Sequence, residues 1–257
     1  LLPQLSAAQA RGDPTHYAGL LDWGLRLVLL LALPCAVALL VFPLLRWLFG
    51  SYRPIHDLVW HERVATLLHR LPLFYVVALV ASMAIVGQSL GNEHAFNGVD
   101  VLGVGLSLWI TLLFGLCAAH ELVHRRSKWE RAAGHVLSGL VGYPLLAFEH
   151  RVHHGSMGDT TTAEWPTTEE SVWRFSVRRL RRITGDLVVI IRGGDGNHAL
   201  RGSTLAGATT LATAAAFFFA AGMVGAATYI ACAVGVAFAM QIMTYLQHWG
   251  PRDGLKK

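Results

Sequence analysis

Six of the thirteen histidines fall into three compact groups whose spacing suits metal binding. His120 and His124 in the motif HELVH are four residues apart, which places both imidazoles on one face of a helix. The motifs FEHRVHHG and YLQHWG contribute the other four, His150, His153, His154 and His248. Neutral imidazoles bind iron, zinc, copper or nickel, so the residue types leave the metal open. Because six imidazoles exceed what one zinc ion can use, two metal ions are predicted.

HELVH also matches the HExxH pattern of zinc proteases, which gives an alternative interpretation. In such a protease the two histidines bind zinc and Glu121 is the general base, with a third ligand such as Asp253 in PRDG. This interpretation leaves the other four histidines without a role. A membrane metalloprotease is therefore a distant alternative, as is a transporter without enzymatic activity.

Two glutamates stand beside these histidines and are the candidate catalytic carboxylates. Glu121 follows His120, and Glu149 precedes His150. A carboxylate next to a metal ligand can orient the imidazole ring and tune the metal. The alternative is an ion pair with a neighbouring arginine, and the sequence does not decide between the two. The arginines in question are Arg125, Arg126 and Arg151.

The elements that must position these residues are membrane helices. Of the 257 residues, 54% are hydrophobic and only 14% are charged, whereas soluble proteins keep about a quarter of their residues charged. Runs without Lys, Arg, Asp or Glu cover 27–45, 71–92, 101–119 and 203–247. About 20 such residues cross a bilayer. An all-α, polytopic integral membrane protein is predicted, which excludes a soluble enzyme, a nucleic-acid-binding protein and a disordered chain.

Five to six transmembrane helices are expected from these runs. The approximate bounds of four of them are 71–91, 100–119, 204–221 and 226–247. The last two belong to one run that is too long for a single crossing, so we predict a break near Gly222 and Gly225 between antiparallel spans. The run 22–48 adds one crossing or a bent hairpin.

The segment 132–148 is predicted to be re-entrant or interfacial. It is short, and it contains Gly134, Gly139, Gly142 and Pro144. If it crossed the bilayer, the arginine-rich stretch that follows would lie outside, against the positive-inside rule. The same rule places all three histidine groups at the cytoplasmic helix ends. The chain 1–257 is thus expected to be one membrane-embedded catalytic domain with a polar cytoplasmic cap at about 149–202.

Taken together, these motifs resemble those of the membrane-bound alkane monooxygenase family within the fatty-acid desaturase and hydroxylase superfamily. The resemblance covers about 71–250. The family's first box maps onto His120, Glu121 and His124, and its second onto Glu149, His150, His153 and His154. Its (N)YxEHYG box maps onto Tyr245, Gln247, His248 and Gly250. This implies an all-helical membrane fold with a non-haem di-iron site at the cytoplasmic helix ends.

Three differences from the family pattern stand out. The second box is one residue shorter and closer to the HxxHH of desaturases, and Gln247 replaces a glutamate. The family's last histidine box is absent before Lys257. We therefore expect the parent chain to extend beyond both ends of this sequence and to supply the remaining ligands after 257. The alternative ligands within the chain are His69, His135 and His198.

The resemblance also implies a reaction and its partners. One oxygen atom of O2 enters a C–H bond of an alkane, alkyl chain or alkyl aromatic, with electrons from rubredoxin or a ferredoxin-type reductase. The substrate is expected to enter from the lipid between apolar side chains, Trp109 among them. A fatty-acyl or lipid desaturase with the same di-iron site is the alternative. The expected location is the bacterial inner membrane, with the active site facing the cytoplasm.

The segment 173–183, WRFSVRRLRRI, places Val177, Leu180 and Ile183 three residues apart, with Arg178, Arg179, Arg181 and Arg182 around them. We predict an interfacial helix whose arginines contact lipid phosphates. Docking of an acidic electron-transfer protein on the same arginines is the second possibility.

Overall fold

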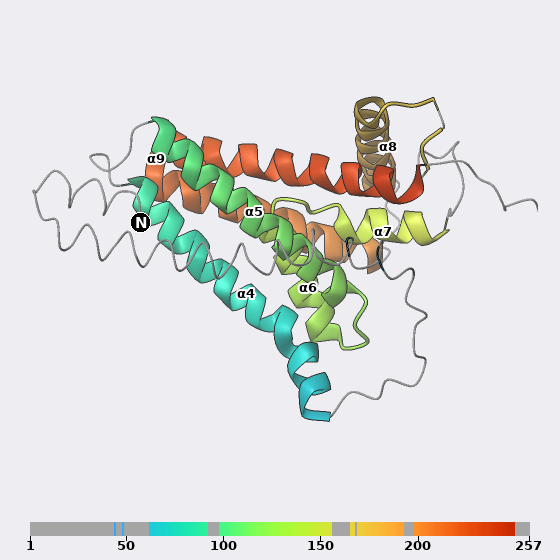
Figure 1. The fold of residues 1–257 in the computed structure, drawn as a ribbon, viewed down its shortest axis with the longest axis horizontal. Coiled ribbons are helices and arrows are strands. Elements are labelled where there is room, and N and C mark those ends of the chain that lie inside the picture. Colours follow the sequence, from blue (N-terminus) through green and yellow to red (C-terminus); the bar gives the residue numbers. More distant parts are fainter. Residues whose placement is uncertain are drawn as a thin grey trace, which may run out of the picture. The chain divides into compact units, whose positions relative to one another are not determined.

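The computed structural model describes Leu44, Leu48 and residues 62–91, 98–155, 165–167, 169–192 and 198–249, with side chains from 101 onward in the second range. These residues form helices and turns, without strands (Figure 1). The helices are α4 (Glu62–Gly91), α5 (Gly98–Val123), α6 (Lys128–Leu140), α7 (Leu146–Gly155), α8 (Val172–Arg192) and α9 (His198–His248). The predicted all-α class is confirmed. Apart from Leu44 and Leu48, the run 22–48 lies outside the described residues, as does Asp253.

The chain divides into two compact units. One comprises Leu1–Leu67 and His94–Asp100, and the other comprises Leu68–Glu93 and Val101–Lys257. The second unit contains every site residue discussed below. The expectation of a single catalytic domain with a cap at 149–202 stays a prediction.

Three of the described helices are long and apolar enough to cross a membrane. They are α4, residues Val101–Val123 of α5 and residues Gly202–His248 of α9. Large apolar side chains such as Val77 and Phe219 are 70% and 85% exposed, as expected for helices that face lipid. The protein is thus an integral membrane protein.

The break predicted near Gly222 is present in α9. Ala221 and Gly222 leave the helical conformation, and Gly222 adopts φ 58°, a left-handed conformation that glycine tolerates best. The rings of Phe217 and Tyr229 stack across the break with centroids 5.4 Å apart. The two arms of α9 therefore lie alongside each other.

The segment 132–148 does not cross as one helix. α6 has 13 residues and ends in a turn at Gly142, where φ is 77°, and α7 starts at Leu146. At about 1.5 Å per residue α6 spans roughly 20 Å, less than the hydrocarbon core. Thr210 and Tyr229, one from each arm of α9, both donate to the carbonyl oxygen of Gly139. The segment is thus held against both arms, and its re-entrant or interfacial position in the bilayer stays a prediction.

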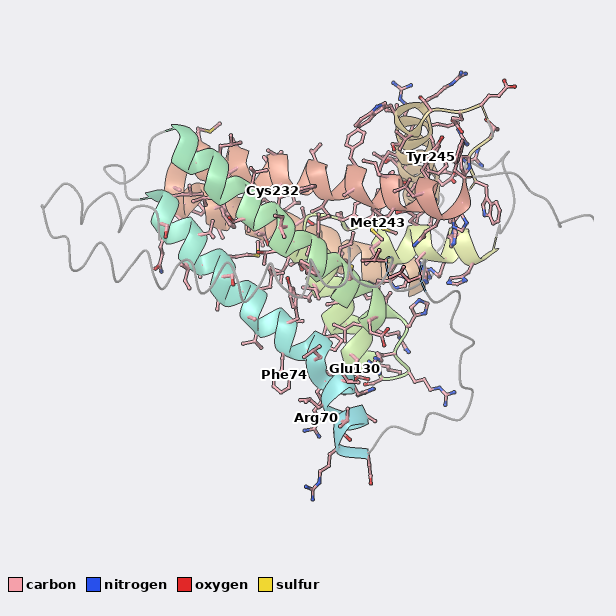
Figure 2. The ribbon with its side chains drawn as sticks, in the orientation of Figure 1. Arg70, Phe74, Glu130, Cys232, Met243 and Tyr245 are labelled. Carbon is pink, nitrogen blue, oxygen red and sulfur yellow. The ribbon has the colours of Figure 1, made fainter. Side chains whose placement is uncertain are left out.

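Helix α8 packs against the C-terminal end of α9. The hydroxyl of Tyr245 donates to the backbone oxygen of Glu170 at 2.6 Å, and its ring lies 5.6 Å from that of Phe175 (Figure 2). One face of α8 is buried: Phe175, Ser176, Arg179 and Ile183 are buried, whereas Val177 is 38% exposed. Phe175, Arg179 and Ile183 are four residues apart along this buried face. The predicted contact of the α8 arginines with lipid phosphates stays a prediction.

Candidate metal centre

The six histidines predicted as metal ligands lie in one continuous group of rings. His120 and His124 stand at the end of α5, three others lie on α7, and His248 ends α9. Ring centroids are 4.4 Å apart for His120–His150, His124–His150 and His150–His154. Those of His153–His154 are 5.8 Å apart and those of His153–His248 4.9 Å apart. Residues from three helices are thus brought to one place.

Three of these histidines converge as closely as a metal ion requires. Candidate ligand nitrogens of His120, His124 and His150 all lie within 4.8 Å of one another. Since metal–imidazole bonds are about 2.0–2.1 Å long, two ligands of one ion are at most about 4.2 Å apart, which requires only small side-chain movements. The Nε2 atom of His154 lies 2.9 Å from that of His150 and extends the cluster. The donor set matches the nitrogen-rich site that non-haem iron or zinc accepts.

His153 and His248 form the other side of the group. The His248 ring also stacks on the indole of Trp165, with centroids 4.6 Å apart and an interplanar angle of 27°. Trp165 was not singled out from the sequence, where a tryptophan before Pro166 indicates only a turn. Its contact limits how the His248 ring can rotate.

Burial and the neighbouring imidazoles keep His150 neutral. Burial, followed by the charges of His120, His124, His154 and His153, lowers the pKa of His150 to about 3. A metal ligand must offer an unprotonated nitrogen, so His150 is available for binding throughout the physiological pH range.

Glu121 lies at the exposed edge of the site. Its side chain is 55% exposed and forms an ion pair of 2.9 Å with Arg125, one of the partners considered from the sequence. Arg125 also contacts His69, which lies 3.2 Å from Glu130 of α6. His69 is thus engaged in a network that joins α4, α5 and α6.

The other alternative ligands are accounted for in different ways. The ring of His135 lies against Gly202, where a Cβ atom would come within 2.3 Å of it. Burial, followed by the charges of Arg151 and Arg131, lowers the pKa of His135. The side chain of His198 is outside the described residues.

Glu149 is buried, and its partner was not anticipated. Its side chain is 1% exposed and forms an ion pair of 3.0 Å with Arg179 of α8, whose side chain is also 1% exposed. Tyr143 and Gln241 donate hydrogen bonds to the same carboxylate. Burial, and then the charge of Glu149, raise the pKa of Tyr143 well above 10, so this hydroxyl keeps its proton.

The structure also locates two other residues named in the sequence analysis, Trp109 and Gln247. The indole of Trp109 lies against Gly235 of α9, where a Cβ atom would come within 2.6 Å of its Nε1. Gln247, at the position of the family's glutamate, is exposed. Gly250 is outside the described residues.

The fold and the histidine cluster define a membrane protein with a candidate metal centre at its helix ends. The sequence model of the fatty acid desaturase family matches residues 99–257, and the chain belongs to this family. The resemblance to membrane-bound alkane monooxygenases is confirmed by two relatives that carry the name alkane 1-monooxygenase.

These relatives are bacterial and longer than the matched region. The one from Pseudomonas putida is 28% identical over 151 residues, which are 54% of this chain and 35% of that protein. The one from Ectopseudomonas oleovorans is 27% identical over 123 residues, 47% of this chain and 28% of that protein. A lipid II flippase MurJ from Burkholderia cenocepacia is 53% identical over 52 residues, 20% of this chain and 10% of that protein. The chain thus spans about a third of the alkane monooxygenases that it matches.

Proposed function

We propose that the protein is a membrane non-haem di-iron monooxygenase that hydroxylates a C–H bond of an apolar substrate with O2. The observation that carries this proposal is the convergence of His120, His124 and His150 within 4.8 Å, beside the remaining predicted ligands. The similarity to proteins named alkane 1-monooxygenase supports the reaction class. The substrate is an alkane, an alkyl chain or an alkyl aromatic.

The six histidines would hold the two iron ions. His120, His124 and His150 lie close enough to hold one ion, and His153, His154 and His248 would supply ligands for the second. When bound, the iron pair supplies the activation of O2 for insertion of one oxygen atom into the C–H bond. The chain's own contribution is to hold uncharged imidazoles in place.

The substrate reaches this site from the lipid phase. The helices that end at the histidines carry exposed apolar side chains along their length, among them Ile110, Phe114 and Met243. An alkyl chain gains its binding free energy from apolar burial and needs few polar contacts. In the orientation that we propose, the membrane is the bacterial inner membrane and the site faces the cytoplasm.

Product analysis tests the reaction. The full chain is supplied with an electron donor, O2 and, in separate assays, a medium-chain alkane, an alkyl aromatic and a fatty-acyl lipid. An alcohol that carries label from 18O2 is the expected product. An alkene without incorporated label would instead establish a desaturase, the second candidate, which the match to the fatty acid desaturase family and the HxxHH spacing favour. No oxidation of any of the three would contradict the proposal.

The electron donor is a rubredoxin or ferredoxin-type protein that docks on α8. Arg174 and Arg181 are exposed, and no ion pair between described residues involves them. Arg178 and Arg182, in contrast, are paired with Glu170 and Asp186. Reversal of Arg174 and Arg181 to Glu should weaken donor-coupled turnover at least about tenfold at low salt, and less at high salt. Unchanged coupling would show that the arginines contact lipid instead.

A further inference from the structure

A buried polar network includes Glu149, the residue that precedes His150 of the histidine cluster. It consists of Tyr143, Glu149, Arg179 and Gln241, whose exposed fractions are 2%, 1%, 1% and 0%. Tyr143 lies in the turn after α6, and the other three lie on α7, α8 and α9, which meet in this region (Figure 1). We call these four residues the Glu149 network.

Three side chains of the Glu149 network donate to the carboxylate. Glu149 Oε1 accepts from Arg179 Nη2 at 3.0 Å and from Gln241 Nε2 at 3.1 Å, and its Oε2 accepts from the Tyr143 hydroxyl. Gln241 Nε2 also donates to the Tyr143 oxygen at 2.9 Å. Both carboxylate oxygens are therefore occupied by donors from three other elements.

A buried network of charged groups destabilises the folded protein when one of its partners is missing. A buried ion pair loses the hydration of both charges, and removal of one partner leaves the other charge without compensation. Side-chain networks of this kind also restrict the neighbouring backbone to one arrangement when every member is present. The position of Glu149 is thus fixed much more tightly than that of the exposed Glu121.

The residue that is fixed stands next to a candidate ligand. Glu149 lies in the first turn of α7 and is followed by His150, and α7 also carries His153 and His154. With only 10 residues, α7 is too short to be stable alone, so its position depends on contacts with the rest of the protein. The buried anchors of α7 are Leu146, Phe148 and Glu149, and Glu149 is the polar one among them.

We propose that Tyr143, Arg179 and Gln241 are positioning residues for the metal centre. By holding Glu149 they fix α7 and keep His150 aimed at His120 and His124. This inference rests on the proposed function, since it assigns these residues to the iron site. The Glu149 carboxylate acts through the backbone of α7 and the three donors, and the basic helix α8 is thereby connected to the metal ligands.

Fe(II) binding by the full chain in detergent or nanodiscs tests the inference. Partners of metal ligands typically change metal affinity 10- to 100-fold, so Arg179→Met should weaken Fe(II) binding by roughly this factor. Arg181→Met is the matched control, because Arg181 lies two residues further along the same helix and is exposed. This control should bind Fe(II) like the unmodified protein. Equal affinities of the two variants would overturn the inference.

A double variant that removes both buried charges separates a positioning role from a general loss of structure. In Glu149→Gln/Arg179→Met both charges are removed, and the amide can still accept from Tyr143. This double variant should recover most of the Fe(II) affinity lost in Arg179→Met, and the iron spectrum of the unmodified protein. If Arg179→Met does not fold, Tyr143→Phe, which removes a single hydroxyl, should show a several-fold loss and an altered spectrum.

The outcomes distinguish this inference from the proposed function. Unmodified protein that binds no Fe(II) would overturn the proposed function, and this inference with it. If the unmodified protein binds Fe(II) and neither Arg179→Met nor Tyr143→Phe changes the affinity, only this inference is overturned.

Discussion

Glu121 and Glu149 both stand next to a predicted metal ligand, yet the protein surrounds them in different ways. Glu121 is 55% exposed and contacts Arg125, which lies four residues further along, just after the end of α5. Glu149 is 1% exposed and contacts residues from three other elements, among them Arg179 thirty positions away in the sequence. A position next to a histidine in the sequence thus gives a local surface ion pair in one case and a buried anchor in the other.

This contrast has energetic consequences. Exposed ion pairs contribute about 0–1 kcal/mol because water screens them and both side chains lose freedom. Loss of one partner from a buried pair costs about 3–5 kcal/mol because an uncompensated charge stays behind. A third pair, Glu170–Arg178, lies between these extremes, with side chains 6% and 31% exposed. The more deeply a carboxylate is buried, the larger its contribution to the free energy of unfolding should therefore be.

The largest effect is expected for Arg179→Met. It leaves Glu149 charged and buried, and should lower the free energy of unfolding by about 3–5 kcal/mol. Unfolding in mixed detergent micelles measures this, with Arg181→Met as the exposed control. A loss below about 1 kcal/mol would show that the Glu149 carboxylate is reached by water.

Tyr143→Phe should have the next largest effect. It removes one hydrogen bond to a carboxylate and keeps the aromatic ring in place, so the expected loss of stability is about 1.5–3 kcal/mol. The same unfolding assay measures it. In a Glu149→Gln/Arg179→Met background the loss should shrink to the roughly 0.5–1.5 kcal/mol of a neutral hydrogen bond if the hydroxyl serves mainly the charge. A loss of unchanged size there would contradict that role.

The pH dependence of stability tests the half-buried Glu170–Arg178 pair. Hydrogen bonding by Arg178, opposed in part by burial, lowers the pKa of Glu170 below its usual value. The stability from this pair is fully present above the unfolded-state pKa of about 4.3, and is lost as pH falls through the lower folded-state pKa. Glu170→Gln should thus cost about 1 kcal/mol at pH 7 and progressively less below pH ~4. A cost that does not change with pH would mean that packing, not charge, makes Glu170 important.

The smallest effect is expected for Glu121→Gln. Because the Glu121–Arg125 pair is largely exposed, the substitution should change stability by less than about 1 kcal/mol and leave Fe(II) affinity within about twofold. Isothermal metal titration and the unfolding assay check both expectations. A tenfold loss of Fe(II) affinity would remove the distinction between the two glutamates.

The sequence predicted those features that depend on local spacing or on length. His120 and His124 share a helix face because of their four-residue spacing, and the break at Gly222 follows from a run too long for one crossing. The convergence of the three histidine groups could be anticipated from the topology, since each group ends or follows a helix expected at the same membrane face.

The Glu149 network could not be predicted in the same way. The five consecutive positions 178–182 are all Arg or Leu, and the sequence pattern assigns every arginine to the exposed side. Burial of Arg179 depends on how α8 crosses α9, which is a tertiary property. Two signals were present: Arg179 lies midway between Phe175 and Ile183, and Gln241 is polar within an apolar run, where polar residues usually face the protein interior.

The metal content of the purified full chain tests the central claim most directly. Protein produced with iron in the medium should contain about two iron ions per chain if the six histidines form one di-iron centre. His150→Ala, which removes the ring in contact with His120, His124 and His154, should lose most of this iron, whereas His135→Ala should retain it. One zinc ion per chain, or full iron content in His150→Ala, would contradict the account.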